Sequence, residues 1–180
     1  MSFILNDAED TMALGRMLAE AMQGSAVRSL YLYAPLGGGK TTLTRGFVSA
    51  LEGGDRAEVS SPSFTLCNVY PTRPEVLHAD LYRLSEGASL PEEMEEILEE
   101  GRAMLILEWP EYLAPEYRDA VRLEVRLVHE GANHAKNLDN ADDSCKCFRS
   151  AAVHACGDAA QALLEELMPR LKKRFSPSAA

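Results

Sequence analysis

Residues 27–42 read VRSLYLYAPLGGGKTT, and this stretch decides the fold. Its first part, 27–33, is rich in β-branched and aromatic residues in alternation with polar ones, which is typical of a strand. From Thr41 to about Leu51 the apolar residues recur at helical spacing. A glycine-rich loop between a strand and a helix favours phosphate binding, because its backbone N–H groups converge on an anion at the start of the helix.

The loop matches most of the pattern G-x-x-x-x-G-K-[ST]. We expect Lys40 to reach the β- and γ-phosphates of a nucleotide and the Thr41 hydroxyl to ligate Mg²⁺. The first glycine of the pattern is replaced by Ala34, which would be strained by about 1 kcal/mol if the backbone needed a positive φ there. The expected phosphate-binding residues are Leu36, Gly37, Gly38, Gly39, Lys40, Thr41 and Thr42.

An acidic residue at the end of a buried strand forms the second half of a P-loop site, aimed at Mg²⁺ or its waters. Glu108 directly follows the apolar run 103–107, and Asp80 ends the segment LHAD. Both strand ends are expected at the carboxyl edge of the sheet, where ligands bind in open α/β folds. Trp109, the only tryptophan, either stacks near the nucleotide or fills the core.

The remaining segments alternate between helices and strands. Helices are expected at 8–23, 91–100 and 157–175, with Pro169 kinking the last one or ending it early. Strands are expected at 64–70, after a loop from 58, and at 75–82, 103–107, 120–128 and 147–155. We therefore predict one α/β domain over 1–180, a three-layer P-loop NTPase-like sandwich with a mostly parallel central sheet and an antiparallel C-terminal hairpin. A polar loop insertion is expected at 130–146 and a loose tail at 176–180.

Charge and composition narrow the class of protein. The chain has 18 basic and 28 acidic residues, a formal net charge of −10, and lacks the basic footprint of a direct nucleic-acid binder. Its four cysteines are too few for a disulfide scaffold and match no zinc-binding spacing. Neither a signal peptide nor a membrane-length apolar run is present, so we expect a cytoplasmic protein without membrane contact.

A P-loop alone is compatible with a kinase, a GTPase or an ATPase. The sequence contains neither [NT]-K-x-D nor D-x-x-G, and this favours an adenine nucleotide over a guanine nucleotide. A small-molecule kinase needs an arginine-bearing lid, and the only lid-like segment, 130–149, offers Lys136, Lys146 and Arg149 among acidic residues. A nucleotide-gated binding module without useful hydrolysis is the third alternative.

Five sequence blocks occur in a characteristic order: LGGGKTT at 36–42, SPSF at 61–64, HADLYRL at 78–84, ILEWPE at 106–111, and a terminal strand–helix unit. Together they resemble the TsaE family, also called YjeE, which are small bacterial ATPases of tRNA modification. Generic P-loop enzymes lack DLYR and EWPE, so the combination is specific. The resemblance covers residues 5–130 well and the remainder loosely.

The resemblance implies roles for particular residues. Lys40, Asp80 and Glu108 would be catalytic, and Thr41, Asp80 and Glu108 would serve Mg²⁺, with the choice between Asp80 and Glu108 as the water-positioning group left open. Ser63 would supply the hydroxyl of a switch-like loop near the γ-phosphate. Trp109 would lie beside the nucleotide, and a catalytic arginine would come from this chain, with Arg83 the nearest candidate, or from a partner.

The resemblance also implies ATP and Mg²⁺ as cofactors and weak ATP hydrolysis by the protein alone. Turnover would occur on a complex of TsaD and TsaB, which makes threonylcarbamoyladenosine beside the anticodon of tRNA. The tRNA would then be met only through that complex, which is consistent with the net charge of −10.

Overall fold

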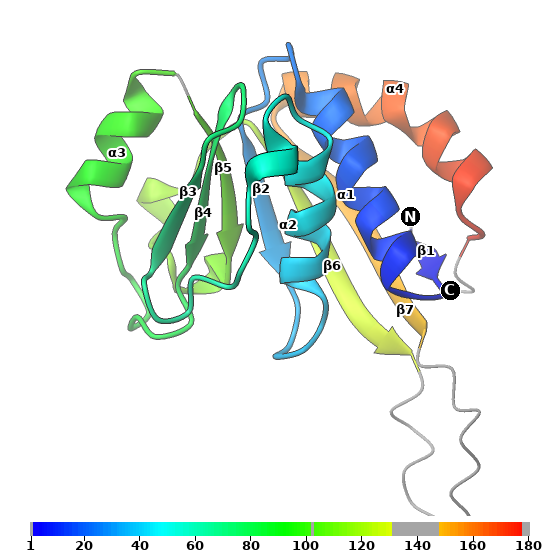
Figure 1. Cartoon of the computed structure of the whole chain (residues 1–180), viewed down its shortest axis with the longest axis horizontal. Helices are drawn as coiled ribbons and strands as arrows, with labels where there is room; N and C mark the ends of the chain where they lie inside the picture. Colours follow the sequence, from blue (N-terminus) through cyan, green and yellow to red (C-terminus); the bar gives the residue numbers. More distant parts are fainter. Residues whose placement is uncertain (1, 102, 131–147, 178–180) are drawn as a thin grey trace, which may run out of the picture.

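A computed structural model describes residues 2–101, 103–130 and 148–177, arranged around one seven-stranded sheet of order β1-β7-β6-β2-β5-β4-β3 (Figure 1). The strands are β1 (Ser2–Leu5), β2 (Ser29–Tyr33), β3 (Cys67–Tyr70), β4 (Glu75–Asp80), β5 (Ala103–Glu108), β6 (Arg122–Glu130) and β7 (Phe148–Cys156). The helices are α1 (Ala8–Met22), α2 (Lys40–Ser49), α3 (Glu92–Glu99) and α4 (Asp158–Arg174). From residue 131 to 146, the expected insertion lies outside the described residues.

The four central strands β6, β2, β5 and β4 are parallel, and antiparallel strands flank them. On one side β7 returns against β6, which confirms the predicted C-terminal hairpin, and on the other side β3 pairs with β4. The α/β fold class is confirmed. The short edge strand β1, which pairs with β7, was not predicted.

Two apolar cores lie on opposite faces of the sheet. Side chains of α1, α2 and α4 form the larger core with one face, and α3 covers the other face together with the segment around Leu113. All six residues of β5 are buried, as its continuous apolar run predicted. No helix in the described part of the chain is long and apolar enough to cross a membrane.

Helix α4 does not end at Pro169, so the expectation of an early end was wrong. Pro169 is exposed, and the carbonyl group that loses its helical partner therefore lies on the side of the helix that water reaches. Leu167 and Leu171 are buried on the opposite side. Their burial favours continuation of the helix past the proline to Arg174.

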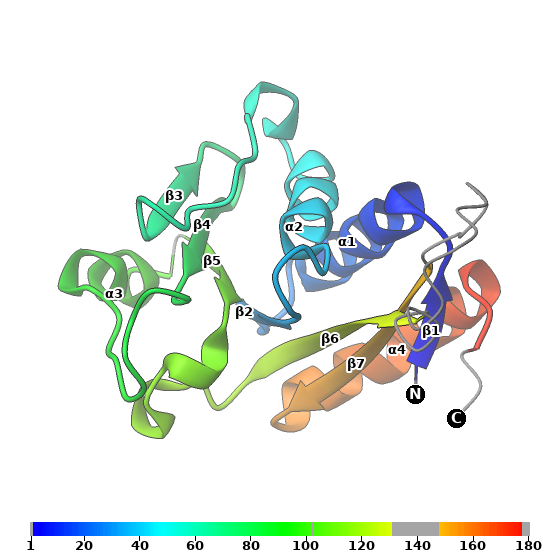
Figure 2. The same cartoon turned by 90° about the horizontal axis from the view of Figure 1, so that it is seen from below.

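Helices α1 and α2 lie side by side (Figure 2), and glycines permit their close approach. A Cβ atom added at Gly46 would lie 2.1 Å from the carbonyl oxygen of Met12, and one added at Gly15 would lie 2.1 Å from that of Leu43. Both distances are far below van der Waals contact, so only glycine permits this approach. The contact fixes the position of α2, whose first residue is Lys40.

We predict that Gly46→Ala destabilises the protein by about 3 kcal/mol or more, because its methyl group must push apart two backbones that cannot repack. Gly24→Ala is the matched control: its φ of +79° is unfavourable for alanine, but no atom lies within 4 Å of the added Cβ. That control should lose only about 1 kcal/mol. Urea unfolding of both variants measures the difference, and equal losses would contradict the proposed helix contact.

Candidate nucleotide-binding site

One cavity of about 320 Å³ opens at the carboxyl ends of β2, β5 and β4. All of the predicted site residues except the candidate arginine line it: Leu36, Gly37, Gly38, Gly39, Lys40, Thr41, Thr42, Ser63, Asp80, Glu108 and Trp109. Two residues that were not predicted, Ser61 and Tyr82, complete the lining. The fold thus brings together residues that lie up to 73 positions apart in the sequence, from Leu36 to Trp109.

The phosphate-loop backbone explains which positions need glycine. Gly37 and Gly39 have φ of 73° and 100°, in the left-handed region that disfavours other residues. At Gly38 an added Cβ would lie 2.7 Å from the Cβ of Ala34. Among the described non-glycine residues only Leu66 and Trp109 have positive φ. Ala34 therefore has a negative φ, and replacement of the first glycine by alanine does not strain the backbone.

The Lys40 side chain is folded against its own loop. Its Nζ donates hydrogen bonds to the carbonyl oxygens of Ala34 at 2.9 Å and Pro35 at 3.3 Å. It also lies 3.8 Å from Glu108 Oε2 and 4.2 Å from the centre of the Trp109 ring. Burial lowers the pKa of Lys40, and the nearby Glu108 carboxylate opposes that shift. The ammonium group therefore lies at the cavity wall, hydrogen-bonded to two carbonyl oxygens of its own loop.

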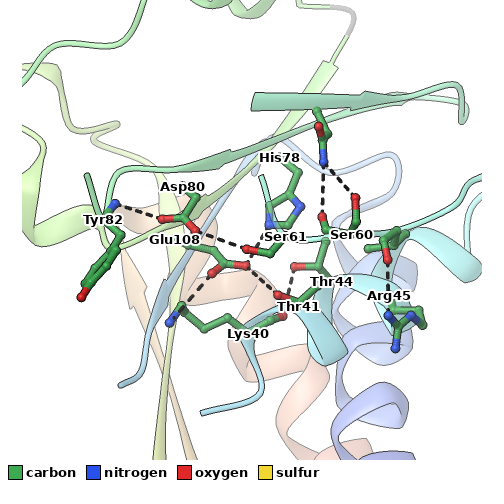
Figure 3. A network of polar contacts seen from close by, with 12 residues as sticks. Lys40, Thr41, Thr44, Arg45, Ser60, Ser61, His78, Asp80, Tyr82 and Glu108 are labelled. Atoms are coloured by element: carbon green, nitrogen blue, oxygen red, sulfur yellow. Dashed lines mark hydrogen bonds and ion pairs between the residues drawn. The ribbon is translucent and has the colours of Figure 1, made fainter. Parts of the chain in front are cut away.

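Glu108 and Asp80 lie side by side, since they are register partners on the parallel strands β5 and β4 (Figure 3). Only 2% of Glu108 and 4% of Asp80 is exposed. The Thr41 hydroxyl lies 3.4 Å from Glu108 Oε1, whereas Asp80 accepts hydrogen bonds from the Tyr82 backbone N–H at 2.9 Å and the Ser61 hydroxyl at 3.4 Å. Burial raises the pKa of Asp80, and the neighbouring Glu108 charge adds to the increase.

The loop before β3 carries two hydroxyl groups, of which only that of Ser63 was predicted for the site, and an exposed aromatic ring. Ser61 and Ser63 face the cavity, but Phe64 is 84% exposed. The Arg83 guanidinium stacks 4.2 Å from the centre of the Phe64 ring. Arg83 is not among the residues that line the cavity, so the structure does not bring this candidate arginine to the site.

Trp109 adopts a left-handed backbone conformation, with φ of 58° and ψ of 49°, directly after Glu108. For a bulky residue this conformation costs about 1–2 kcal/mol. Its ring lies over Lys40 and 5.0 Å from the Tyr82 ring, at the cavity rather than deep in the core. Of the two alternatives for this residue, the structure supports the position beside the cavity.

The oxygen donors at the cavity fit a magnesium ion. Mg²⁺ is typically held by one or two carboxylates together with phosphate oxygens and water, not by an all-protein cage. Thr41 and Glu108 lie together, with Asp80 next to them. Within the described ranges, no group of three or more His, Cys, Asp or Glu side chains could hold a metal ion by itself.

His78 is the functional candidate that sequence reasoning missed. It is fully buried on β4, and its Nε2 lies 2.9 Å from Glu108 Oε1. The available signal was the two-residue period of a strand, which puts His78 on the same face as Asp80. The pairing with Glu108 depends on the register between two strands and is not visible in the sequence.

We predict that Asp80→Asn stabilises the nucleotide-free protein by about 0.5–2 kcal/mol at pH 7.5. The raised pKa of Asp80 means that the folded state favours the neutral form of this carboxyl group. The neutral Asp80 side chain therefore contributes stability at low pH. That contribution is lost as the pH rises above the usual pKa of aspartate, about 4. The gain should narrow when urea unfolding is repeated at pH 5. Asp55→Asn, at an exposed position, is the control. A less stable Asp80→Asn protein at pH 7.5 would contradict the prediction.

Comparison with known proteins assigns the family. The family model described as "Threonylcarbamoyl adenosine biosynthesis protein TsaE" matches residues 5–138. A tRNA threonylcarbamoyladenosine biosynthesis protein TsaE of Aquifex aeolicus is 37% identical over 128 residues, covering 71% of this chain and 87% of the relative. Its counterpart from Streptomyces coelicolor is 34% identical over 130 residues, covering 69% and 85%.

The fold is also that of a solved structure. The crystal structure of Bacillus subtilis YdiB superposes with a TM-score of 0.64 at 24% sequence identity, covering 94% of this chain and 95% of that one. This likeness supports the fold, whereas the family rests on the sequence matches. The P-loop, the paired carboxylates and the match over residues 5–138 agree, and the chain belongs to the TsaE family.

Proposed function

We propose that this chain binds ATP and Mg²⁺ in the cavity, hydrolyses the ATP, and thereby serves the formation of threonylcarbamoyladenosine beside the tRNA anticodon together with TsaD and TsaB. One observation carries the proposal: the P-loop, Lys40 and two buried carboxylates line a single cavity. The membership of the TsaE family connects this site with the modification named for its relatives.

The loop amides and the start of α2 would hold the phosphates, because backbone N–H groups and the helix dipole favour an anion there. Lys40 would exchange its bonds to the Ala34 and Pro35 carbonyl oxygens for phosphate oxygens and offset charge on the transferred group. Thr41 and Glu108 would hold Mg²⁺, which when bound would supply positive charge beside the phosphates.

The contacts of the two carboxylates favour a division of labour. Glu108 lies against Thr41 and Lys40, so it would serve the metal and phosphate side of the site. Asp80 instead contacts Ser61 and has a raised pKa, which suits a group that orients and accepts a proton from water. We therefore propose Asp80 as the residue that positions the attacking water, with Ser63 near the γ-phosphate.

Charge favours a protein partner between this chain and tRNA. The net charge is −10, and the exposed glutamates of α3 present an acidic surface. Such a surface repels an RNA backbone, so the tRNA would be held by the TsaD–TsaB complex in the cytoplasm. A surface of this kind does not oppose binding of ATP, because the loop amides and Lys40 meet the phosphates locally.

We predict that ATP with Mg²⁺ changes the intrinsic fluorescence of the protein in a saturable way, because its only tryptophan, Trp109, lines the cavity. Lys40→Ala should weaken the fitted affinity about 10–100-fold, the usual effect of losing a charge-assisted hydrogen bond. Lys172→Ala, at an exposed position of α4, should bind like the wild type. Equal affinities of the Lys40 variant and the wild type would refute this account of the site.

We predict slow phosphate release by the protein alone and a marked rise when TsaB and TsaD are added. Lys40→Ala should lower the stimulated rate at least about 100-fold, as expected for loss of a group that stabilises transition-state charge, and should abolish tRNA modification in the reconstituted assay. A phosphate-release assay with TsaB–TsaD measures this. Absence of both stimulation and co-purification would refute the proposal, whereas transfer of phosphate to a metabolite without the partners would identify a kinase.

A further inference from the structure

A chain of buried side chains leads away from Glu108. His78, with 0% of its surface exposed, lies 2.9 Å from Glu108 Oε1 through its Nε2 (Figure 3). On the other side of the ring, Nδ1 lies 3.2 Å from the hydroxyl of Tyr70. That hydroxyl in turn donates a hydrogen bond to the carbonyl oxygen of Ser60 at 3.1 Å. The chain therefore connects Glu108 with the start of the loop that carries Ser61.

The chemistry of the groups sets the direction of these bonds. An ionised carboxylate only accepts hydrogen bonds, so Nε2 of His78 carries a proton and donates it to Glu108. The Tyr70 hydroxyl donates to the Ser60 carbonyl oxygen and lies within hydrogen-bond distance of Nδ1, so the second ring nitrogen also has a partner. The orientation of the ring is thus fixed at both nitrogens.

Among the contacts of Glu108, the one to His78 is the shortest. Thr41 Oγ1 lies at 3.4 Å and Lys40 Nζ at 3.8 Å, and both of these groups face the cavity. A bound nucleotide would take Thr41 and Lys40 as its own partners. His78 would then keep the Glu108 carboxylate in place, because His78 is fully buried and does not line the cavity. A merely space-filling residue would not need a nitrogen at each of these two positions.

We propose that His78 is a positioning residue for Glu108, and that with Tyr70 it couples the orientation of this carboxylate to the loop beginning at Ser60. The inference rests on the proposed function, because it assigns Glu108 to the metal side of an ATPase site. It extends that function by making the placement of Ser61 and that of Glu108 depend on one another through a buried path.

Two variants separate the two nitrogens of His78. His78→Gln retains a donor at the position of Nε2, and His78→Asn retains a polar group only near Nδ1. The two variants both replace the buried imidazole ring by an amide side chain. A difference between them therefore does not come from loss of the ring alone. His154→Gln, at an exposed position of β7, is the control for histidine loss elsewhere.

We expect His78→Asn to lower kcat of the partner-stimulated hydrolysis about 10–100-fold, the usual effect of losing a residue that orients a site ligand. The Kd for ATP, measured by Trp109 fluorescence, should stay within about twofold of wild type, because the loop amides and Lys40 are untouched. His78→Gln should recover most of the rate. Equal kcat losses in the two variants, a loss confined to Kd, or no loss in His78→Asn would overturn the inference.

A double-mutant cycle tests the contact independently of hydrolysis. Unfolding equilibria of wild type, His78→Asn, Glu108→Gln and the double variant are compared in urea without nucleotide. We expect non-additive effects, with a coupling of about tenfold in the unfolding constant. Additive effects would overturn the inference even in an active enzyme, whereas an inactive wild type with strong coupling would overturn the proposed function and leave the contact standing.

Discussion

The burial of the Glu108 carboxylate constrains the rest of the site. An ion at the end of a strand whose residues are all buried loses its hydration, and this costs several kcal/mol unless other groups replace the water. His78, Thr41 and Lys40 are those groups, and they come from β4 and from the first turn of α2. Moving α2 away from β5 would leave the buried charge of Glu108 without Thr41 and Lys40 as partners. Two constraints therefore position α2 against the carboxyl edge of the sheet. One is the need of the Glu108 charge for partners, and the other is the glycine contact between α2 and α1.

Asp80 shows the opposite balance. It lies in register with a second buried carboxylate, and burial together with that neighbour raises its pKa. A protein selected for stability alone would place an uncharged residue there, since the like charges of Asp80 and Glu108 oppose folding at neutral pH. In the proposed function, bound phosphates and Mg²⁺ would bring in a cation that attracts both carboxylates. The unfavourable pair is thus understandable as preorganisation for a metal-bound anion, in agreement with the clustering of perturbed groups at functional sites.

Much of this arrangement was predictable because it is local. The glycine loop, Lys40 and the order of strands and helices depend on neighbours in sequence, and all of the predicted site residues except Arg83 line the cavity. Other features depend on partners far away. The four residues of β1 become a strand through pairing with β7 and with the segment that follows α4. Helix α4 passes Pro169 because distant apolar surfaces bury Leu167 and Leu171. The contact between His78 and Glu108 requires the register of β4 and β5, which no local pattern specifies.

The conformation of Trp109 joins these considerations. Its left-handed backbone costs about 1–2 kcal/mol in any bulky residue, and glycine would relieve that cost. Yet the same turn lets the Trp109 N–H bond the Leu32 carbonyl oxygen at 3.3 Å, which ties the end of β5 to the P-loop strand, and it lays the ring over Lys40. Glycine would keep the first contact and lose the second. Because this strain persists beside the two buried carboxylates, the indole ring itself is needed next to Lys40.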